Sequence, residues 1–350
     1  MSKYAETFHT IADILSFETP ASTLETTFSD PSFNWDAIVV EGSKYLVLPA
    51  IYCRLKSRRL LHLLPEELVL YLDEISSINR NRNRSILKQV HAISTLLNAH
   101  HINHVFLKGT ALLVSGKYED IAERMVGDID ILVSNEQLQD AFHLLKSNGY
   151  NKTFGYAYEK SDFRHLDRLI SEQELAAIEI HSNLLIKNKR HLIDIPLVLQ
   201  SKIECNGIAI PNFKTLSLHQ ILSWQLNDKG HYYNFPNFKV LYDVILTHSH
   251  KNNALITTLF KIKEGQSFIA IAQHYFEEFL YIETNKYMKI IQFSHKCTMN
   301  FRPLRVIQNV FKYAFDFVLS RIYLMATNKY YTKHVFHKIF SKTTRKKTPV

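Results

Sequence analysis

The stretch Gly127-Asp128-Ile129-Asp130-Ile131-Leu132-Val133 alternates carboxylates with aliphatic residues, as a buried strand does. Side chains at positions i and i+2 of a strand point to the same side, so Asp128 and Asp130 project together while the aliphatic residues fill the core. Two carboxylates this close repel each other unless a cation lies between them. Oxygen ligands suit Mg²⁺ or Mn²⁺, whose coordination is usually completed by substrate phosphates. The stretch therefore predicts a metal site and phosphoryl or nucleotidyl transfer.

A second phosphate-binding feature lies upstream. Val105-Phe106-Leu107 predicts a short buried strand that ends at Lys108-Gly109-Thr110, where a helix begins. Free N–H groups and the dipole at a helix start favour phosphate, so the backbone of the glycine and the threonine is predicted to bind it. Lys108 and Arg124 are expected to offset negative charge on a triphosphate and on the leaving pyrophosphate. A structural ion pair is the alternative for both cations.

A third carboxylate follows downstream. Ile178-Glu179-Ile180-His181 repeats the alternation, so Glu179 is predicted to project from a neighbouring strand beside the acidic pair. An Asp-x-Asp pattern alone has a structural alternative, in which the acidic residues lie in a solvated turn that precedes an ordinary strand. Carboxylates side by side on strands have little structural value that would offset their repulsion, and this favours a functional trio.

These motifs together resemble a known family. Leu-Lys-Gly, a later arginine, Asp-Ile-Asp-Ile-Leu-Val and Ile-Glu-Ile-His are similar to motifs of the uncharacterised bacterial nucleotidyltransferases in the DNA polymerase β-like superfamily. The resemblance covers Ile86 to about Leu185 and extends weakly to Asp243. Thr110 stands where the family usually has serine, and the loop from Ala111 to Gly127 is longer than in much of the superfamily.

The resemblance implies a metal-dependent enzyme that moves a nucleoside monophosphate from an NTP to an acceptor hydroxyl and releases pyrophosphate. Asp128, Asp130 and Glu179 would be the catalytic residues and would hold two Mg²⁺ or Mn²⁺ ions. Glu179 would also help to remove the acceptor proton. His181 resembles the family's Glu-x-His pair and would orient the acceptor or a water. The residues do not fix the base of the NTP, and ATP binding is the default expectation.

The sequence leaves the acceptor open. A small or carrier-linked hydroxyl is slightly favoured, because residues 1–300 are close to neutral. A tRNA or other RNA acceptor, as in a toxin-like enzyme, would fit the basic C-terminus. A non-catalytic nucleotide- or RNA-binding module is a third alternative, and the intact carboxylate trio argues against it.

The charge of the chain is concentrated in residues 301–350, which contain eleven Lys and Arg and a single acid, Asp316. Aromatic residues are interleaved with these cations. Such a segment can bind RNA or contact an anionic membrane surface peripherally. The favoured interpretation is a terminal helix that buries its aromatic side in the core and solvates its lysines.

Pattern and composition predict an α+β fold. We expect a polymerase β-like nucleotidyltransferase core, a small mixed sheet with helices, over residues 86–200. An N-terminal helical region is expected over 1–85 and a C-terminal helical region with a basic tail over 201–350. Asn79-Arg80-Asn81-Arg82-Asn83-Arg84 is predicted to be a linker that leads into a helix. Its arginines are expected at a solvated helix start or in intramolecular pairs with acidic helices, and contact with nucleic acid is the alternative. No leader and no long apolar run is seen, so a cytoplasmic location without a transmembrane segment is expected.

Overall fold

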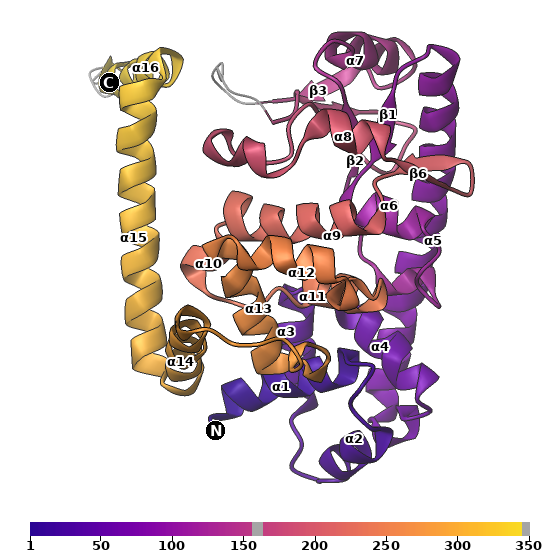
Figure 1. Cartoon of the computed structure of the whole chain (residues 1–350), viewed down its shortest axis with the longest axis vertical. Helices are drawn as coiled ribbons and strands as arrows, with labels where there is room; N and C mark the ends of the chain where they lie inside the picture. The colour runs from indigo at the N-terminus through magenta and orange to yellow at the C-terminus, as the bar shows by residue number, and fades with distance from the viewer. Residues whose placement is uncertain (156–163, 345–350) are drawn as a thin grey trace, which may run out of the picture.

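The computed structural model describes residues 1–155 and 164–344, with side chains as far as Ile339. It shows a small sheet against one end of a long helix, with further helices around it (Figure 1). The sequence pattern also predicts a strand over 150–156 and a hairpin of 163–170 with 176–181. Tyr156, Phe163 and the end of the basic tail lie outside the described residues.

The N-terminal region is helical, as predicted. Its longer elements are α1 (Lys3–Leu15), α2 (Ala21–Phe28), α3 (Trp35–Lys44), α4 (Leu48–Ser57) and α5 (Glu66–Ala99). Side chains of Ser2 and Asn34 accept hydrogen bonds from backbone N–H groups at the starts of α1 and α3, which satisfies donors that a helix leaves free.

The arginine-rich segment 79–84 is not a linker. It continues the helix, so α5 runs unbroken for 34 residues and contains the boundary proposed at residue 85. No glycine or proline interrupts the segment, and Asn79 and Asn83, four positions apart on one side of the helix, are buried against the body of the protein. Arg80 forms hydrogen bonds of 2.6 to 3.1 Å with Asp120, and Arg82 donates to the carbonyls of Val126 and Gly127. The intramolecular ion pair is therefore confirmed for Arg80, whereas Arg82 contacts backbone carbonyls.

The predicted mixed sheet is confirmed, with strand order β1-β2-β5-β4-β3. The strands are β1 (His104–Phe106), β2 (Ile129–Val133), β3 (Lys152–Phe154), β4 (Arg168–Ile170) and β5 (Ile178–His181). Strands β2 and β5 are parallel, and the other pairs are antiparallel. The parallel pair lies in the interior because every residue of β2 and β5 is buried. Two further helices accompany the sheet, α6 (Lys108–Val114) and α7 (Leu138–Ser147).

The chain then becomes helical again, apart from a small hairpin. These elements are α8 (Ile195–Gln200), β6 (Ile203–Cys205), β7 (Ile208–Ile210), α9 (Phe213–Leu222), α10 (Gly230–Tyr233), α11 (Phe238–Leu246), α12 (Asn253–Phe260), α13 (Lys263–Tyr275) and α14 (Lys286–Asn300). The sequence pattern predicts one helix over 266–289, but the structure has two helices there, α13 and α14. The side chain of Asn285 caps a new helix start there by accepting from the N–H of Met288.

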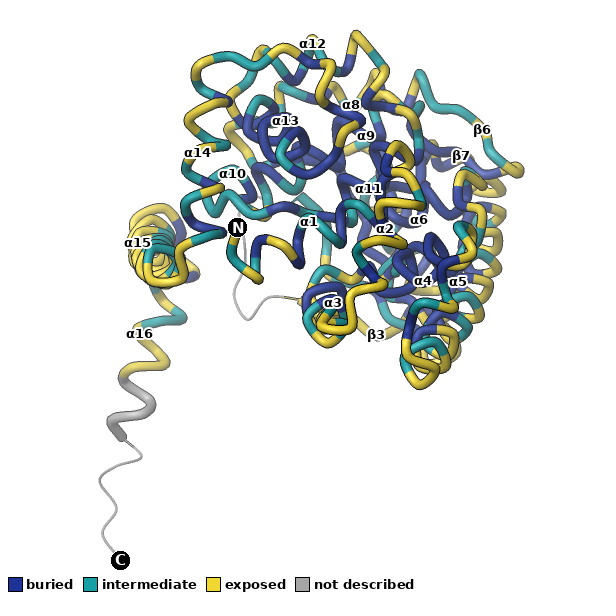
Figure 2. Tube along the Cα trace, turned by 90° about the horizontal axis from the view of Figure 1, so that it is seen from below, coloured by how far each residue is buried: buried dark blue, intermediate teal, exposed yellow. Residues whose placement is uncertain are grey.

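The C-terminal helices contradict the favoured sequence interpretation. Helix α15 (Arg302–Thr327) and helix α16 (Lys329–Thr344) follow α14, and α15 runs along the side of the body opposite α5 (Figure 1). None of the residues of α15 is buried, and Figure 2 shows it nearly end-on beside the body. Its aromatic side is thus not packed into the core. Within the described part of the chain, none of the helices combines the length and the apolar character needed to cross a bilayer.

Candidate active site

The three predicted carboxylates meet at the parallel pair of strands. Asp130 and Glu179 are register partners on β2 and β5, so their side chains leave the same face of the sheet. Asp128 lies two residues before Asp130 and projects to that same side. Ile129 and Ile131, which have no exposed surface, fill the other side as the alternation predicts.

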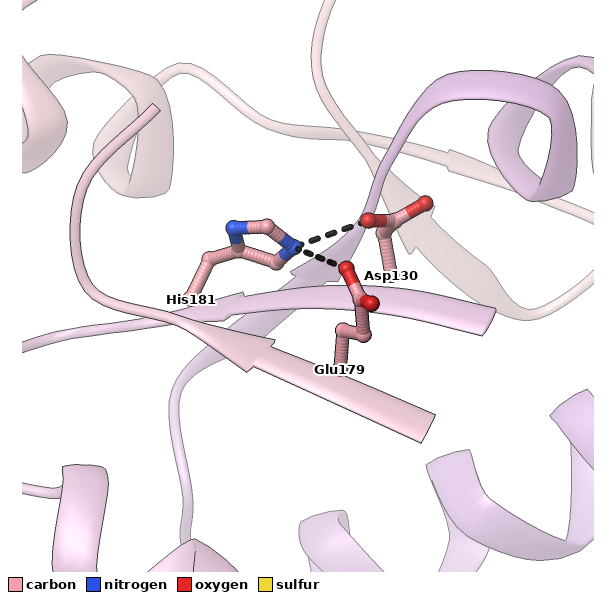
Figure 3. A group of neighbouring side chains, drawn as sticks. All are labelled: Asp130, Glu179 and His181. Atoms are coloured by element: carbon pink, nitrogen blue, oxygen red, sulfur yellow. Dashed lines mark hydrogen bonds and ion pairs between the residues drawn. The ribbon is translucent and has the colours of Figure 1, made fainter. Parts of the chain in front are cut away.

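Cationic and imidazole side chains of the protein hold these carboxylates. The Nζ of Lys108 lies 2.6 Å from Asp130 Oδ1, and Arg168 Nη2 lies 3.0 Å from Asp128 Oδ2 and 2.5 Å from Glu179 Oε1. The Nε2 of His181 lies 2.8 Å from Asp130 Oδ1 and 3.7 Å from Glu179 Oε2 (Figure 3). A connected network therefore joins all three carboxylates.

The three carboxylates differ in their electrostatics. Burial opposes ionisation of Asp130, but the Lys108 ammonium and the His181 hydrogen bond outweigh it and hold its pKa well below the usual range. Burial also opposes ionisation of Glu179, and hydrogen bonds from His181 and Arg168 bring its pKa down to about 2. The pKa of Asp128 is raised, by burial first and then by the charges of Asp130 and Glu179. Asp128 thus carries the uncompensated repulsion that an added cation would relieve.

The turn before α6 approaches the carboxylates through an unusual backbone. Lys108 has φ +50°, a left-handed conformation that costs a non-glycine residue about 1 kcal/mol. A Cβ on Gly109 would lie 3.0 Å from Val126 Cγ2, so a larger residue would push against the loop that carries Asp128. The Thr110 hydroxyl donates to the carbonyl of Asp128. The turn predicted to bind phosphate is therefore built into the acidic site.

A cavity of about 300 Å³ opens beside this turn. Its wall on the sheet side includes the turn and the acidic pair. Helices and loops of the C-terminal half form the facing wall, with Gln220, Ser223, Trp224, Asp228, Asn237, Lys239 and Val240. Arg164 also lines it, so cations enter the cavity from several parts of the chain. A polyanion such as a triphosphate matches this lining.

Arg124 reaches the cavity but is already engaged. Its Nη2 lies 3.0 Å from Asp243 Oδ2, and both side chains are buried. The hydroxyl of Tyr118 donates to the other oxygen of Asp243 at 2.6 Å. The structural ion pair considered for Arg124 is therefore present. Its role with phosphate stays a prediction.

The donor set fits a divalent cation. One ligand atom each from Asp130, Glu179 and His181 can be chosen so that all lie within 4.8 Å of one another. Carboxylate oxygens suit Mg²⁺ and Mn²⁺, and an imidazole nitrogen is a ligand typical of transition ions. The sequence predicted Asp128 as the third ligand and His181 on the acceptor side, whereas the geometry puts His181 between Asp130 and Glu179. Asp128 and Glu179 are linked indirectly, because both carboxylates contact Arg168.

Three cations of the site were not predicted from the sequence: Arg164, Arg168 and Lys239. In the antiparallel pair of β4 and β5, Leu169 lies opposite Ile178. The preceding residue of β4, Arg168, therefore lies opposite the following residue of β5, Glu179. Aligning the predicted hairpin residue by residue could have found it. Lys239 begins a different helix far along the chain, and no local signal marks it. Lys229 and Tyr233, which precede Lys239 in the chain, contact Asp316 of α15 instead.

Comparison with known proteins agrees with the geometry. No curated protein matches the chain. Residues 31–254, well over half of the chain, match the family described as an uncharacterised nucleotidyltransferase. The matched region contains α3 to α11, the whole sheet and both walls of the cavity. The chain therefore belongs to this nucleotidyltransferase family.

Proposed function

We propose that the protein transfers a nucleoside monophosphate from an NTP to an acceptor hydroxyl with the help of a divalent cation, Mg²⁺ or Mn²⁺. The observation that carries the proposal is the meeting of three carboxylates: Asp128 directly before β2, Asp130 on β2 and Glu179 on β5. Asp128 and Asp130 also line the cavity, together with several cations. Family membership supports the transfer of a nucleotidyl group. The expectation of two ions stays a prediction.

In this proposal, Asp128, Asp130 and Glu179 hold the cation and His181 adds a nitrogen ligand or orients Asp130. When bound, the cation would withdraw charge from the triphosphate and favour ionisation of the acceptor hydroxyl. Arg168 now neutralises Asp128 and Glu179, and its side chain is 41% exposed, so it is free to turn from them towards solvent or phosphate.

The remaining residues act on substrate. The acceptor oxygen forms a bond to the α-phosphorus while the bond to the pyrophosphate oxygen breaks. Glu179 takes the acceptor proton, directly or through a water. Lys108 and Lys239 approach the cavity from opposite walls and offset the charge that develops on pyrophosphate. Trp224 offers an aromatic surface beside them for a nucleobase or an acceptor ring.

We propose a small or carrier-linked acceptor. Residues 1–300 contain the whole cavity and carry almost no net charge, whereas RNA binding depends on many Lys and Arg contacts to phosphate. Helix α15 exposes mainly apolar side chains and therefore offers few cations to the phosphates of an RNA acceptor.

Transfer of label from two forms of each NTP tests the reaction class. Purified protein would be incubated with Mg²⁺, a metabolite extract or total RNA, and NTP labelled with ³²P at either the α or the γ position. The proposal requires label from the α position in the acceptor product and label from the γ position in pyrophosphate. Transfer of the γ label to the acceptor would instead identify a kinase. Labelling only in the RNA arm would replace the proposed acceptor class.

A further inference from the structure

Helix α15 is amphipathic, yet its polar side faces the protein. Its half-buried residues include a stripe at helical spacing, Arg305, Gln308, Asn309, Lys312, Asp316 and Ser320. Asp316 pairs with Lys229, and Lys312 Nζ lies 3.5 Å from the carbonyl of Tyr233. Arg305 donates to carbonyls at the end of α14. Polar groups thus make many of the contacts with the body, beside a ring contact between Tyr313 and Tyr233.

The opposite side of α15 is apolar and exposed. We call this set the outer face: Ile307, Val310, Phe311, Phe317, Val318 and Ile322. Each of these side chains is more than half exposed, and Phe311 reaches 71%. Figure 2 shows exposed residues around most of the circumference of α15. An apolar stripe this long on one helix indicates an interaction surface, because soluble proteins rarely expose contiguous apolar patches of this kind.

We propose that the outer face lies in the interfacial layer of an anionic lipid bilayer. Helices that lie flat in this layer carry aromatic and aliphatic residues on one side and basic residues around them. The segment from Arg302 to Ile339 contains seven Lys and Arg against Asp316. Arg321 lies within the outer face, with its guanidinium stacked 5.1 Å from the Phe317 ring. Its charge can therefore reach lipid phosphate while its stem remains with apolar neighbours.

Charge also decides against two other occupants. A second copy of the chain would bring two strongly basic segments together, and like charges at an interface repel. RNA would need Lys or Arg across the contacting surface, but the outer face offers one arginine among aliphatic side chains that cannot pair with phosphate. An anionic membrane satisfies both the apolar face and the basic charge around it. Because α15 lies flat on the membrane, this proposal does not require the helix to span it.

Vesicle binding by the full chain tests the proposal. We expect the wild type to co-sediment with phosphatidylcholine vesicles that contain phosphatidylglycerol, and to bind vesicles of phosphatidylcholine alone much more weakly. Phe311→Glu puts a charge in the middle of the outer face and should lower the vesicle affinity about tenfold. Leu70→Glu is the matched control: Leu70 is 65% exposed and belongs to α5. Helix α5 lies on the side of the body opposite α15 (Figure 1), so this substitution should leave binding unchanged.

A second readout reports insertion itself. Phe311→Trp should show a blue shift of its tryptophan fluorescence on addition of the anionic vesicles, because the indole leaves water. Equal vesicle binding by wild type and Phe311→Glu, or no binding by the wild type, would overturn the proposal. So would a dimer in sedimentation velocity that Phe311→Glu dissociates, which would assign the outer face to a second copy. Single-stranded RNA binding that depends on Phe311 would assign it to nucleic acid.

Discussion

Asp130 and Glu179 occupy matching positions on the parallel strands β2 and β5, and the imidazole of His181 contacts both carboxylates. This pairing brings together two acids that are 49 positions apart in the chain. The cations that hold them, Lys108 and Arg168, come from two further elements. A site assembled from four segments is specified by the sheet as a whole, so its function can be tested one segment at a time.

Removal of the Asp128 charge should abolish metal-dependent stabilisation by NTP. For the wild type, NTP with Mg²⁺ or Mn²⁺ at about 100 times Kd adds about 2.7 kcal/mol of stability and raises Tm by several degrees. Asp128→Asn should fold, since its side chain is 34% exposed, but should show little of this shift. Asp140→Asn, on the exposed surface of α7, is the control and should behave as the wild type. Differential scanning fluorimetry makes the comparison, and a full shift in Asp128→Asn would exclude Asp128 as a ligand of the metal and leave Asp130, Glu179 and His181 to hold it.

Lys239 should make NTP affinity depend on pH. Burial, and then the nearby Arg124, lower the pKa of Lys239 to about 8. Its amine is therefore charged at pH 7 and neutral at pH 9. Loss of one charged contact to phosphate should weaken NTP binding about tenfold over this range. In Lys239→Met the affinity should be weak at both pH values, and calorimetric titration can measure this. The same pH dependence in wild type and variant would place Lys239 outside the triphosphate site.

The polar residues of α5 should act on catalysis by positioning the loop that leads to Asp128. Asn83, which is fully buried, donates to the carbonyls of Ile121 and Arg124, and Arg82 donates to those of Val126 and Gly127. We expect Arg82→Met to lower kcat about tenfold with a smaller change in KM, because the loop shifts while the phosphate contacts remain. Arg84→Met, on the exposed side of the same helix, is the matched control. Equal kcat values for the two variants would contradict a positioning role.

The protein should lose stability on mild acidification because of two buried histidines. Burial lowers the pKa of His219 and of His295 to about 3. Between pH 6.5 and pH 3 the unfolded chain binds protons at these positions and the folded chain does not, so stability falls as pH falls. Each histidine contributes a slope of about 1.4 kcal/mol per pH unit, or roughly 2 kcal/mol at pH 5.

Replacing one of these histidines isolates its contribution. In His295→Gln, the slope of unfolding free energy between pH 6 and pH 4.5, measured by urea titration, should be smaller by about 1.4 kcal/mol per unit. The exposed His143→Gln should leave the slope unchanged. An unaltered slope in His295→Gln would show that His295 becomes protonated without unfolding.

The sequence predicts the strands of the site well because their signals are local. The alternation around Asp128 and Asp130 and around Glu179 predicts two strands and the direction of their side chains, and the structure has both. The partner of each strand is not a local property. The opposition of Asp130 and Glu179 depends on the connection through α7, β3 and β4, and Lys239 reaches the cavity only through packing of α11. The sequence therefore predicts that Glu179 lies beside the acidic pair, but not that it is the register partner of Asp130 or that Lys239 lines the cavity.

The C-terminal helix shows where the pattern misleads. Its polar stripe and apolar face are plain in the sequence, and the usual rule assigns the apolar face to the core. In the structure, the contacts of Asp316 with Lys229 and Tyr233 turn the polar stripe inward instead. Amphipathicity predicts that a helix has two environments, but it does not identify which one is the protein.

The central claim is that the carboxylates of β2 and β5 hold the divalent cation that receives the NTP. Crystals grown with Mn²⁺ and a non-hydrolysable NTP analogue test it most directly, through anomalous difference density at the manganese edge. We predict a peak bound by Asp130 and Glu179, together with Asp128 or His181, and in contact with analogue phosphates. Lys108 or Arg168 should have moved from its carboxylate towards those phosphates. A nucleotide bound elsewhere would contradict the account. So would an analogue bound in the cavity without a manganese peak and with the Lys108–Asp130 and Arg168–Glu179 pairs intact.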